Sequence, residues 1–196
     1  DKNQLIALDV SSNTALEYLE CSESQLTTLN IGSNTKLKSL ICSKNQLTSL
    51  DVSGNTALKD LVCSENRLAT PNLSINPALE NLDCSKNQLT GLDLSGNAAL
   101  KNLDCSGNQL TTLGFSDGAV LEKLICSDNR LATLNVSGSA KLTELHCGQN
   151  KLASLDVSKN TALEKLDCSG NQLTTLVVSS NTALTGLDCP KNNLTS

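Results

Sequence analysis

Nine cysteines recur at intervals of 21 residues, with no insertion or deletion between the first and the last. A strict period of this length is typical of a solenoid, in which each repeat forms one coil and equivalent residues of successive coils stack in a column. The cysteine column therefore fixes the phase of every other residue. Its members are Cys21, Cys42, Cys63, Cys84, Cys105, Cys126, Cys147, Cys168 and Cys189.

Each repeat consists of two similar halves. The first half reads Leu-x-x-Leu-x-Cys-Ser-x-Asn and the second reads Leu-x-x-Leu-Asp-Val/Leu-Ser-x-Asn, as in residues 79–87 and 89–97. Within each half, two apolar residues lie on one side of an extended segment with a polar residue between them. The Ser-x-Asn that follows is turn chemistry. We therefore predict a mainly β fold with little or no helix, in which each coil has a firm strand around Cys and a weaker second strand around Val.

The columns also predict which side chains form the core. The columns that begin at Leu5, Leu16 and Leu19 contain only Leu, and the column that begins at Leu8 is interrupted only by Pro71. With the Cys and Val columns, this gives six inward apolar positions per coil. The chain has one Phe, one Tyr and no Trp. A thin coil filled by Leu has no room for aromatic rings, so their scarcity supports the solenoid.

Two columns of asparagine occupy the turns. We predict that their side chains bond local backbone and the amide of the next coil, so that buried backbone groups are satisfied. Two segments depart from the pattern, around Pro71 and over 114–118, and we expect the second strand to be weakest there. One column runs from Asn3 to Asn192 with Ser24 as the exception, and the other runs from Asn13 to Asn181 with Gly118 and Ser139 as exceptions.

The strand segment, as in Leu103-Asp-Cys105-Ser-Gly-Asn108-Gln-Leu110, resembles the leucine-rich-repeat motif with Cys at one Leu position. The 21-residue period and the doubled half-repeat are similar to those of internalin J-like bacterial surface proteins and of the repeat class called IRREKO. The resemblance covers residues 1–196 and implies a right-handed leucine-rich-repeat solenoid with a parallel sheet on its concave face. It also implies an extracellular or cell-surface location, with adhesion as the usual activity.

The domain organisation follows from the uninterrupted period. Residues 1–196 form a single array of about nine coils, which begins and stops in mid-repeat and which we interpret as an uncapped excerpt of a longer protein. The exposed core at each end makes end-to-end self-association a hypothesis. The net charge of −5 argues against a nucleic-acid partner. No run of eighteen apolar residues is present, so we expect no membrane insertion.

The cysteines are expected to be free, buried thiols, because they point the same way and lack the spacing of a zinc site. A metal or redox role is the weaker alternative. The position before Val alternates largely between Asp and Asn, and a stacked Asp column could hold calcium. Spacing the carboxylates with Asn suggests instead that the column avoids repulsion between like charges. We therefore expect no cofactor.

Catalysis has one candidate constellation. His146 is the only histidine, and Glu144 and Asp167 adjoin it on the same strand face. A general acid/base pair could be built from these groups, but no Ser or Cys nucleophile stands apart from its column. A solvated polar face explains them more simply. We therefore predict that the protein is not an enzyme.

The outward positions on either side of the inward strand Leu vary from coil to coil, whereas the inward columns are nearly constant. An apolar patch with a polar rim on an extended sheet is a common recognition surface, although Ile and Val also suit strands through β propensity alone. The predicted ligand-binding residues of the concave face are Tyr18, Glu20, Ile41, Asp60, Val62, Asp83, Asp104, Lys123, Ile125, Glu144, His146 and Asp167.

These observations favour a non-catalytic scaffold that binds a protein or glycan ligand, on a host or neighbouring cell, through the concave strand face. The alternative is a structural spacer array without a ligand. A minor alternative is an ice-binding surface on the opposite face, which has a row of hydroxyl side chains interrupted by Gly91. That row contains Thr28, Ser49, Thr70, Thr112, Thr133, Ser154 and Thr175.

Overall fold

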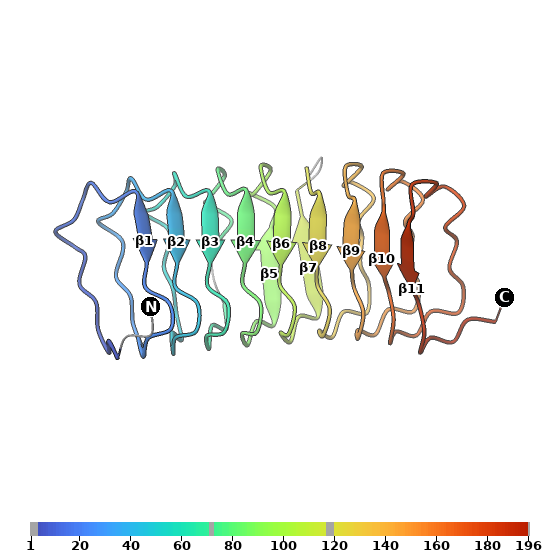
Figure 1. Ribbon diagram of the computed structural model, residues 1–196, viewed down its shortest axis with the longest axis horizontal. Coiled ribbons are helices and arrows are strands. Elements are labelled where there is room, and N and C mark those ends of the chain that lie inside the picture. Colours follow the sequence, from blue (N-terminus) through green and yellow to red (C-terminus); the bar gives the residue numbers. More distant parts are fainter. Residues whose placement is uncertain (1–3, 71–72, 117–119, 196) are drawn as a thin grey trace.

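The computed structural model describes residues 4–70, 73–116 and 120–195, and these residues contain no helix. The chain winds into coils that stack along one axis, with the two chain ends at opposite ends of the array (Figure 1). No described segment could cross a membrane as a helix. The strands are β1 (Tyr18–Glu20), β2 (Ser39–Ile41), β3 (Asp60–Val62), β4 (Asn81–Asp83), β5 (Gly91–Leu94), β6 (Asn102–Asp104), β7 (Thr112–Phe115), β8 (Lys123–Ile125), β9 (Glu144–His146), β10 (Lys165–Asp167) and β11 (Gly186–Asp188).

Nine of these strands form one parallel sheet in the order β1-β2-β3-β4-β6-β8-β9-β10-β11. Each strand pairs with the next so that residues 21 positions apart are neighbours. Leu40, Leu61 and Leu82, for example, lie side by side on three adjacent strands. Each coil has the same number of residues, so no strand has to slip to bury its central Leu. The predicted fold class is confirmed for this sheet.

The six predicted inward positions per coil are confirmed. In one coil, all six side chains are only 0 to 7% exposed. Equivalent residues of the neighbouring coils pack above and below them in a single continuous core. The six residues of this coil are Leu47, Leu50, Val52, Leu58, Leu61 and Cys63.

The second strand is less general than predicted. Among the described residues, only β5 and β7 pair in this half of the coil, apart from one isolated bridge between Asp9 and Asn30. Turns and asparagine side chains, rather than strand pairing, connect the other coils here. The prediction of a weak strand near Gly114 is wrong. Compared with the Asp or Asn of other coils, glycine lacks only an outward side chain, and the Gly114 backbone still pairs with Asp93. Pro71 lies outside the described residues.

The turn after each Cys contains a residue in the left-handed region. The residue two positions after Cys has a φ between 51° and 65° in all nine coils, and it is glycine in only two of them. The turn after Val contains no such residue in the described part of the chain. The apolar spacing explains the difference, because Cys63 is followed by Leu68 after five residues, whereas Val52 is followed by Leu58 after six. The shorter path requires the tighter turn.

The first asparagine column forms a ladder on the cysteine side of the coils, which we call the cysteine-side ladder. Asn66 illustrates it: Nδ2 donates to the carbonyls of Cys42 (3.0 Å) and Cys63 (3.1 Å), and Oδ1 accepts the amide of Leu47 (3.0 Å). Both ends of the side chain are therefore used, and they join two coils. The structural role predicted for this column is confirmed, although the amide that Oδ1 accepts belongs to the previous coil rather than to the next one.

The second column forms the valine-side ladder, in which only the donor end of each asparagine side chain is used. The bond to an amide of the next coil that was predicted for this column is therefore wrong. Asn55 Nδ2 donates to the carbonyls of Ile31 (3.1 Å) and Asn34 (2.8 Å) in the previous coil. Its backbone amide, rather than its side chain, closes the turn onto the Val52 carbonyl (2.9 Å). The buried Oδ1 atoms of this ladder have no hydrogen-bond partner in Asn34, Asn55, Asn76, Asn97, Asn160 and Asn181.

Candidate ligand-binding face

All twelve predicted ligand-binding residues lie on the outward side of the nine-stranded sheet, which we call the strand face. They occupy two rows that run across the strands, separated by the row of inward Leu side chains. The first row contains Tyr18, Asp60, Lys123 and Glu144, and the second row contains Glu20, Ile41, Val62, Asp83, Asp104, Ile125, His146 and Asp167. The distance of each residue from the nearest cysteine in the sequence thus predicts correctly that its side chain lies on the strand face. The binding role of these residues stays a prediction.

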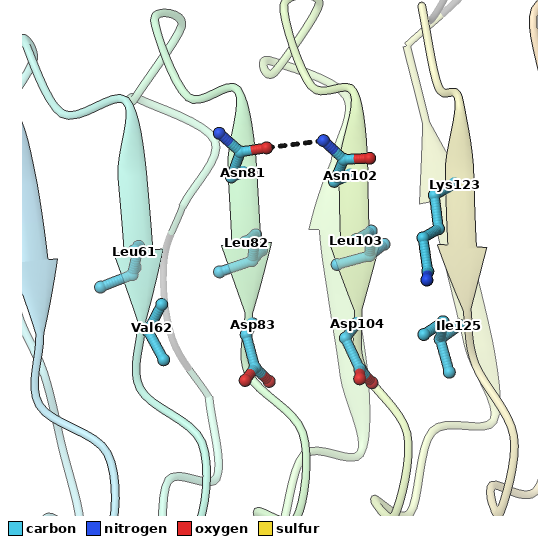
Figure 2. A pocket seen from close by; sticks show the side chains of 10 residues that line it. All are labelled: Leu61, Val62, Asn81, Leu82, Asp83, Asn102, Leu103, Asp104, Lys123 and Ile125. Atoms are coloured by element: carbon cyan, nitrogen blue, oxygen red, sulfur yellow. Dashed lines mark hydrogen bonds between the residues drawn. The ribbon is translucent and has the colours of Figure 1, made fainter.

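The middle of the first row is a chain of side-chain hydrogen bonds. Asn102 Nδ2 donates to Asn81 Oδ1 (2.7 Å), and Asn81 Nδ2 donates to Asp60 Oδ1 (2.5 Å). Figure 2 shows the bond between the two asparagines, which lie side by side on β4 and β6. Sequence reasoning did not include these two asparagines in the site, although their column was already known to face outward.

Glu144 has three basic side chains around its carboxylate on the strand face. Its carboxylate lies 2.9 Å from His146 Nε2, 2.9 Å from Lys123 Nζ and 3.8 Å from Lys165 Nζ. The hydrogen bond from His146, followed by that from Lys123, lowers the pKa of Glu144 to about 2. With three basic side chains around it, this carboxylate is held as an anion by its own sheet.

The N-terminal part of the strand face has the only tyrosine. Tyr18 is 53% exposed, and its hydroxyl donates to Glu20 Oε2 at 2.7 Å. That hydrogen bond, with the nearby negative charge, raises the pKa of Tyr18. Ile41 follows Glu20 in the second row, and Val62 follows Ile41. Ile41 and Val62 are therefore adjacent on the sheet, with Glu20 and Asp83 as their neighbours in the same row.

A hollow of about 300 Å³ lies over β3, β4, β6 and β8. Its centre is the pair Asp83 and Asp104, which are opposite each other in register. Val62 and Ile125 lie on the two outer sides of this pair, and the Lys123 side chain extends along β8 toward Ile125 (Figure 2). All of these side chains are half-buried. The hollow brings together two apolar residues that are three strands apart, which no local sequence pattern indicates.

The Asp column before Val has a structural explanation that does not involve calcium. In every described Asp or Asn of this column a side-chain oxygen accepts the amide of the residue two positions later, as in Asp51 with Ser53 at 2.9 Å and Asn135 with Ser137 at 3.0 Å. Such a bond caps the turn and is equally available to Asp and Asn. In the described parts of the chain, no group of three His, Cys, Asp or Glu residues could hold a metal ion.

The cysteines are free and, with the exception of half-buried Cys189, fully buried. Burial raises the pKa of Cys63 and Cys126 to about 12, because the thiolate would lose its solvation. A buried thiol with a raised pKa is a poor nucleophile. The cysteine column therefore behaves as part of the core, as the sequence predicts.

The opposite face has exposed hydroxyl side chains, as expected, but the described residues form no continuous sheet beneath them. The two-stranded sheet of β5 and β7 lies near a hollow of about 500 Å³ that Thr70, Gly91, Thr112 and Gly114 help to line. Gly91 leaves a gap in the hydroxyl row. The regular flat lattice that an ice-binding surface needs is therefore interrupted in these coils.

Comparison with known proteins shows which family has this architecture. Models of leucine-rich repeats match residues 77–117 and 162–184. The functional domain of InlJ from Listeria monocytogenes, which includes a cysteine ladder, matches with a TM-score of 0.93 and 42% sequence identity, over 95% of this chain and 42% of that one. The chain belongs to the leucine-rich-repeat proteins. Its cysteine-containing repeats are of the internalin-like bacterial type, so the predicted family is confirmed.

Two other bacterial protein structures show the same fold at lower identity. A leucine-rich-repeat protein of Leptospira interrogans matches with a TM-score of 0.85 and 28% identity, over 95% of this chain and 52% of that one. YopM from Yersinia enterocolitica matches with a TM-score of 0.82 and 28% identity, over 93% of this chain and 39% of that one. This leucine-rich-repeat chain thus spans about half or less of these solved chains. No curated protein matches it significantly by sequence.

Proposed function

We propose that this leucine-rich-repeat array is a non-catalytic binding scaffold of a bacterial surface or secreted protein. It recognises a protein or glycan ligand, on a host or neighbouring cell, through the strand face, and adhesion is the activity that it serves. The similarity to the functional domain of InlJ supports the surface assignment.

The contrast between the inside and the outside of the sheet carries this proposal. Across the nine coils the central strand position is always Leu, whereas the second row changes among Glu, Ile, Val, Asp and His. A spacer needs only the constant core. The variable row also surrounds the hollow at Asp83 and Asp104, where apolar and charged groups converge on one extended surface.

The candidate acid/base pair fits this scaffold role. Glu144 contacts His146 directly and is held as an anion by Lys123 and Lys165 as well. A carboxylate with a pKa of about 2 is a weak base. The described residues place no hydroxyl or thiol nucleophile in hydrogen-bond contact with His146. These groups stabilise the face rather than form a catalytic pair.

The experiment compares two triple variants with the same change in net charge. The first, Ile41→Lys, Val62→Lys and Asp83→Lys, introduces positive charge on the strand face. The control, Thr28→Lys, Ser49→Lys and Glu164→Lys, places the same charge elsewhere on the surface. Binding is measured on arrays of glycans and of host-cell surface proteins, and by adherence to cells.

The proposal requires that ligands bound by the wild type are lost by the first variant and kept by the control. Equal binding by both variants would remove the strand face as the site. A wild-type protein that binds nothing on either array, in the folded state, would favour the spacer alternative.

End-to-end self-association stays a separate prediction. Leu5 and Ile6 are exposed at one end of the array, and Leu187 and Leu194 are exposed at the other. A second copy of the chain could cover these residues by continuing the stack. Light scattering over a wide concentration range tests this prediction, since a constant monomer mass would contradict it.

A further inference from the structure

Asp83 and Asp104 differ from Glu144 in their lack of a positive partner. They face each other on β4 and β6 and are half-buried, yet no basic side chain of the described residues lies within ion-pair distance of either carboxylate. Lys123, the nearest cation in the hollow, pairs with Glu144 instead. The negative charge of Glu144 is therefore balanced by basic neighbours, whereas the charges of Asp83 and Asp104 are not.

Each of these two carboxylates uses one oxygen to hold its own turn. Asp83 Oδ1 accepts from the amide (3.0 Å) and hydroxyl (2.7 Å) of Ser85, and Asp104 Oδ1 accepts from the amide (3.0 Å) and hydroxyl (2.6 Å) of Ser106. The second oxygen of each remains free to accept a donor. Parallel strands lie about 4.8 Å apart, so the two charges repel each other across the strands. A positive group between them would remove that repulsion.

The walls of the hollow indicate what kind of positive group fits. Val62 lies next to Asp83 and Ile125 lies next to Asp104, so that the order across the strands is apolar, acidic, acidic, apolar. Long basic side chains place an apolar stem against such walls and a charged tip against carboxylates. A divalent ion would instead need about six or more oxygen ligands, which two carboxylates with an oxygen each committed to serine do not supply.

We propose that the hollow receives one cationic side chain, arginine or lysine, from a protein ligand, with its charged end between Asp83 and Asp104 and its stem against Val62 or Ile125. The inference rests on the proposed function and makes it specific: the ligand is a protein, and its contact residue is basic and flanked by apolar residues. Arginine fits best, because its planar fork can donate to two carboxylates at once.

A conservative variant can remove the charge without disturbing the fold. Asn135, elsewhere in the chain, accepts the amide (3.0 Å) and hydroxyl (2.7 Å) of Ser137 in the same way that Asp83 and Asp104 accept from their serines. The double variant Asp83→Asn and Asp104→Asn should therefore keep both turns. The matched control is Asp51→Asn and Asp93→Asn, which also neutralises two carboxylates that accept the amide of a serine two positions later, but outside the strand face.

The experiment selects random short peptides, displayed on yeast, for binding to the complete wild-type chain. The selected peptides are expected to be enriched in arginine or lysine with apolar neighbours. Neutralising Asp83 and Asp104 should weaken their binding about tenfold or more, whereas the control variant should change it less than about twofold. Replacing the basic residue of a selected peptide with neutral citrulline should weaken binding to the wild type by the same factor. The same replacement should cause no further loss of binding to the double asparagine variant.

Two outcomes separate the inference from the proposed function. Peptides that are lost by the Ile41→Lys, Val62→Lys and Asp83→Lys variant, but that bind the double asparagine variant as well as the wild type, would overturn the cationic contact and leave the binding face standing. Peptides that bind all variants equally, or a selection that yields no peptide dependent on the strand face, would overturn both. Enrichment of acidic peptides would also contradict the cationic contact.

Discussion

The two asparagine ladders occupy turns of the same sequence, Ser-x-Asn, on opposite sides of each coil, yet they are bonded differently. On the cysteine side, the side-chain amide of Asn66 reaches the carbonyl of Cys63, and its oxygen accepts an amide from the previous coil. On the valine side, the backbone amide of Asn55 reaches the carbonyl of Val52, and the side-chain oxygen is left without a partner. The same residue therefore supports the two turns by different atoms.

The cause is the length of chain that must cross each corner. The cysteine-side turn has one residue fewer between its inward apolar side chains, and it places a residue such as Glu65 in the left-handed region. For a residue other than glycine this conformation costs about 1–2 kcal/mol. The tighter turn is thus strained, and the fully bonded asparagine holds it. The valine-side turn is relaxed and needs less support, so we infer that it opens more easily.

The largest expected effect comes from removing one asparagine from each ladder. Asn108→Ala leaves the buried amide of Leu89 without an acceptor and frees the carbonyls of Cys84 and Cys105. We expect a loss of about 3 kcal/mol in the free energy of unfolding. Asn97→Ala frees only two carbonyls and also removes an unpartnered oxygen, so its loss should be about 1 kcal/mol.

Urea unfolding followed by circular dichroism measures both losses. Gln109→Ala, beside the first ladder, serves as a control and should change stability by less than about 0.5 kcal/mol. Equal losses for the two asparagine variants would remove the distinction between the ladders.

The second prediction uses the ionisable groups of the cysteine side. The pKa of Cys63 and Cys126 is about 12 in the folded chain, because burial disfavours the thiolate, whereas an unfolded thiol ionises near 9. A pKa raised in the folded state contributes stability that is complete below about pH 9 and is lost as pH rises toward 12, by up to about 1.4 kcal/mol per pH unit for each thiol. The valine side has no inward group that ionises.

Urea unfolding between about pH 8 and pH 10 tests this loss, and the variant Cys63→Ala with Cys126→Ala should show a shallower decline with pH. An identical decline in the variant would assign the alkaline sensitivity to surface groups instead.

The third prediction concerns backbone strain. Gln149 has a φ of 53° on the cysteine side, so Gln149→Gly should raise the free energy of unfolding by about 0.5 kcal/mol as steric strain is released. Lys159 occupies the equivalent position on the valine side without a positive φ, and Lys159→Gly should lower stability by a similar amount, because glycine adds only freedom to the unfolded chain there. Thermal melting of the two variants gives the sign, and shifts in the same direction would contradict the difference in strain.

The smallest expected effect comes from the Asp residues that cap valine-side turns. Hydrogen bonds from the following serine lower the pKa of Asp51, Asp93 and Asp156 below the usual 3.8. A pKa lowered in the folded state contributes stability above pH 3.8 that is lost as pH falls through the folded value. Asparagine at these three positions, as at Asn135, should make the hydrogen-exchange protection factors of the capped amides, which are corrected for the intrinsic pH dependence of exchange, insensitive to acid. Acid sensitivity that persists in the triple variant would be inconsistent with this origin.

The sequence predicts the repeat, the inward columns and the strand face with accuracy, because a fixed period leaves the register no freedom. It does not predict that the second sheet is limited to β5 and β7, because pairing there depends on how closely the coils approach. Gly114 favoured a weak strand in the sequence, yet its backbone pairs with Asp93. The hollow was also missed as a unit, since Val62 and Ile125 are brought together only by stacking across three strands. The two kinds of asparagine turn could have been separated by the spacing of five and six residues between apolar positions.

The exact register of the sheet has a consequence for how such a gene can change. The hydrogen bonds that the two ladders make between coils join residues 19, 21 or 24 positions apart, and these offsets recur from coil to coil. Duplicating or deleting one 21-residue segment therefore rejoins every bond with its original geometry, wherever the cut falls. Recombination can thus alter the length of the array freely, while each new copy of the strand face is left to diverge on its own.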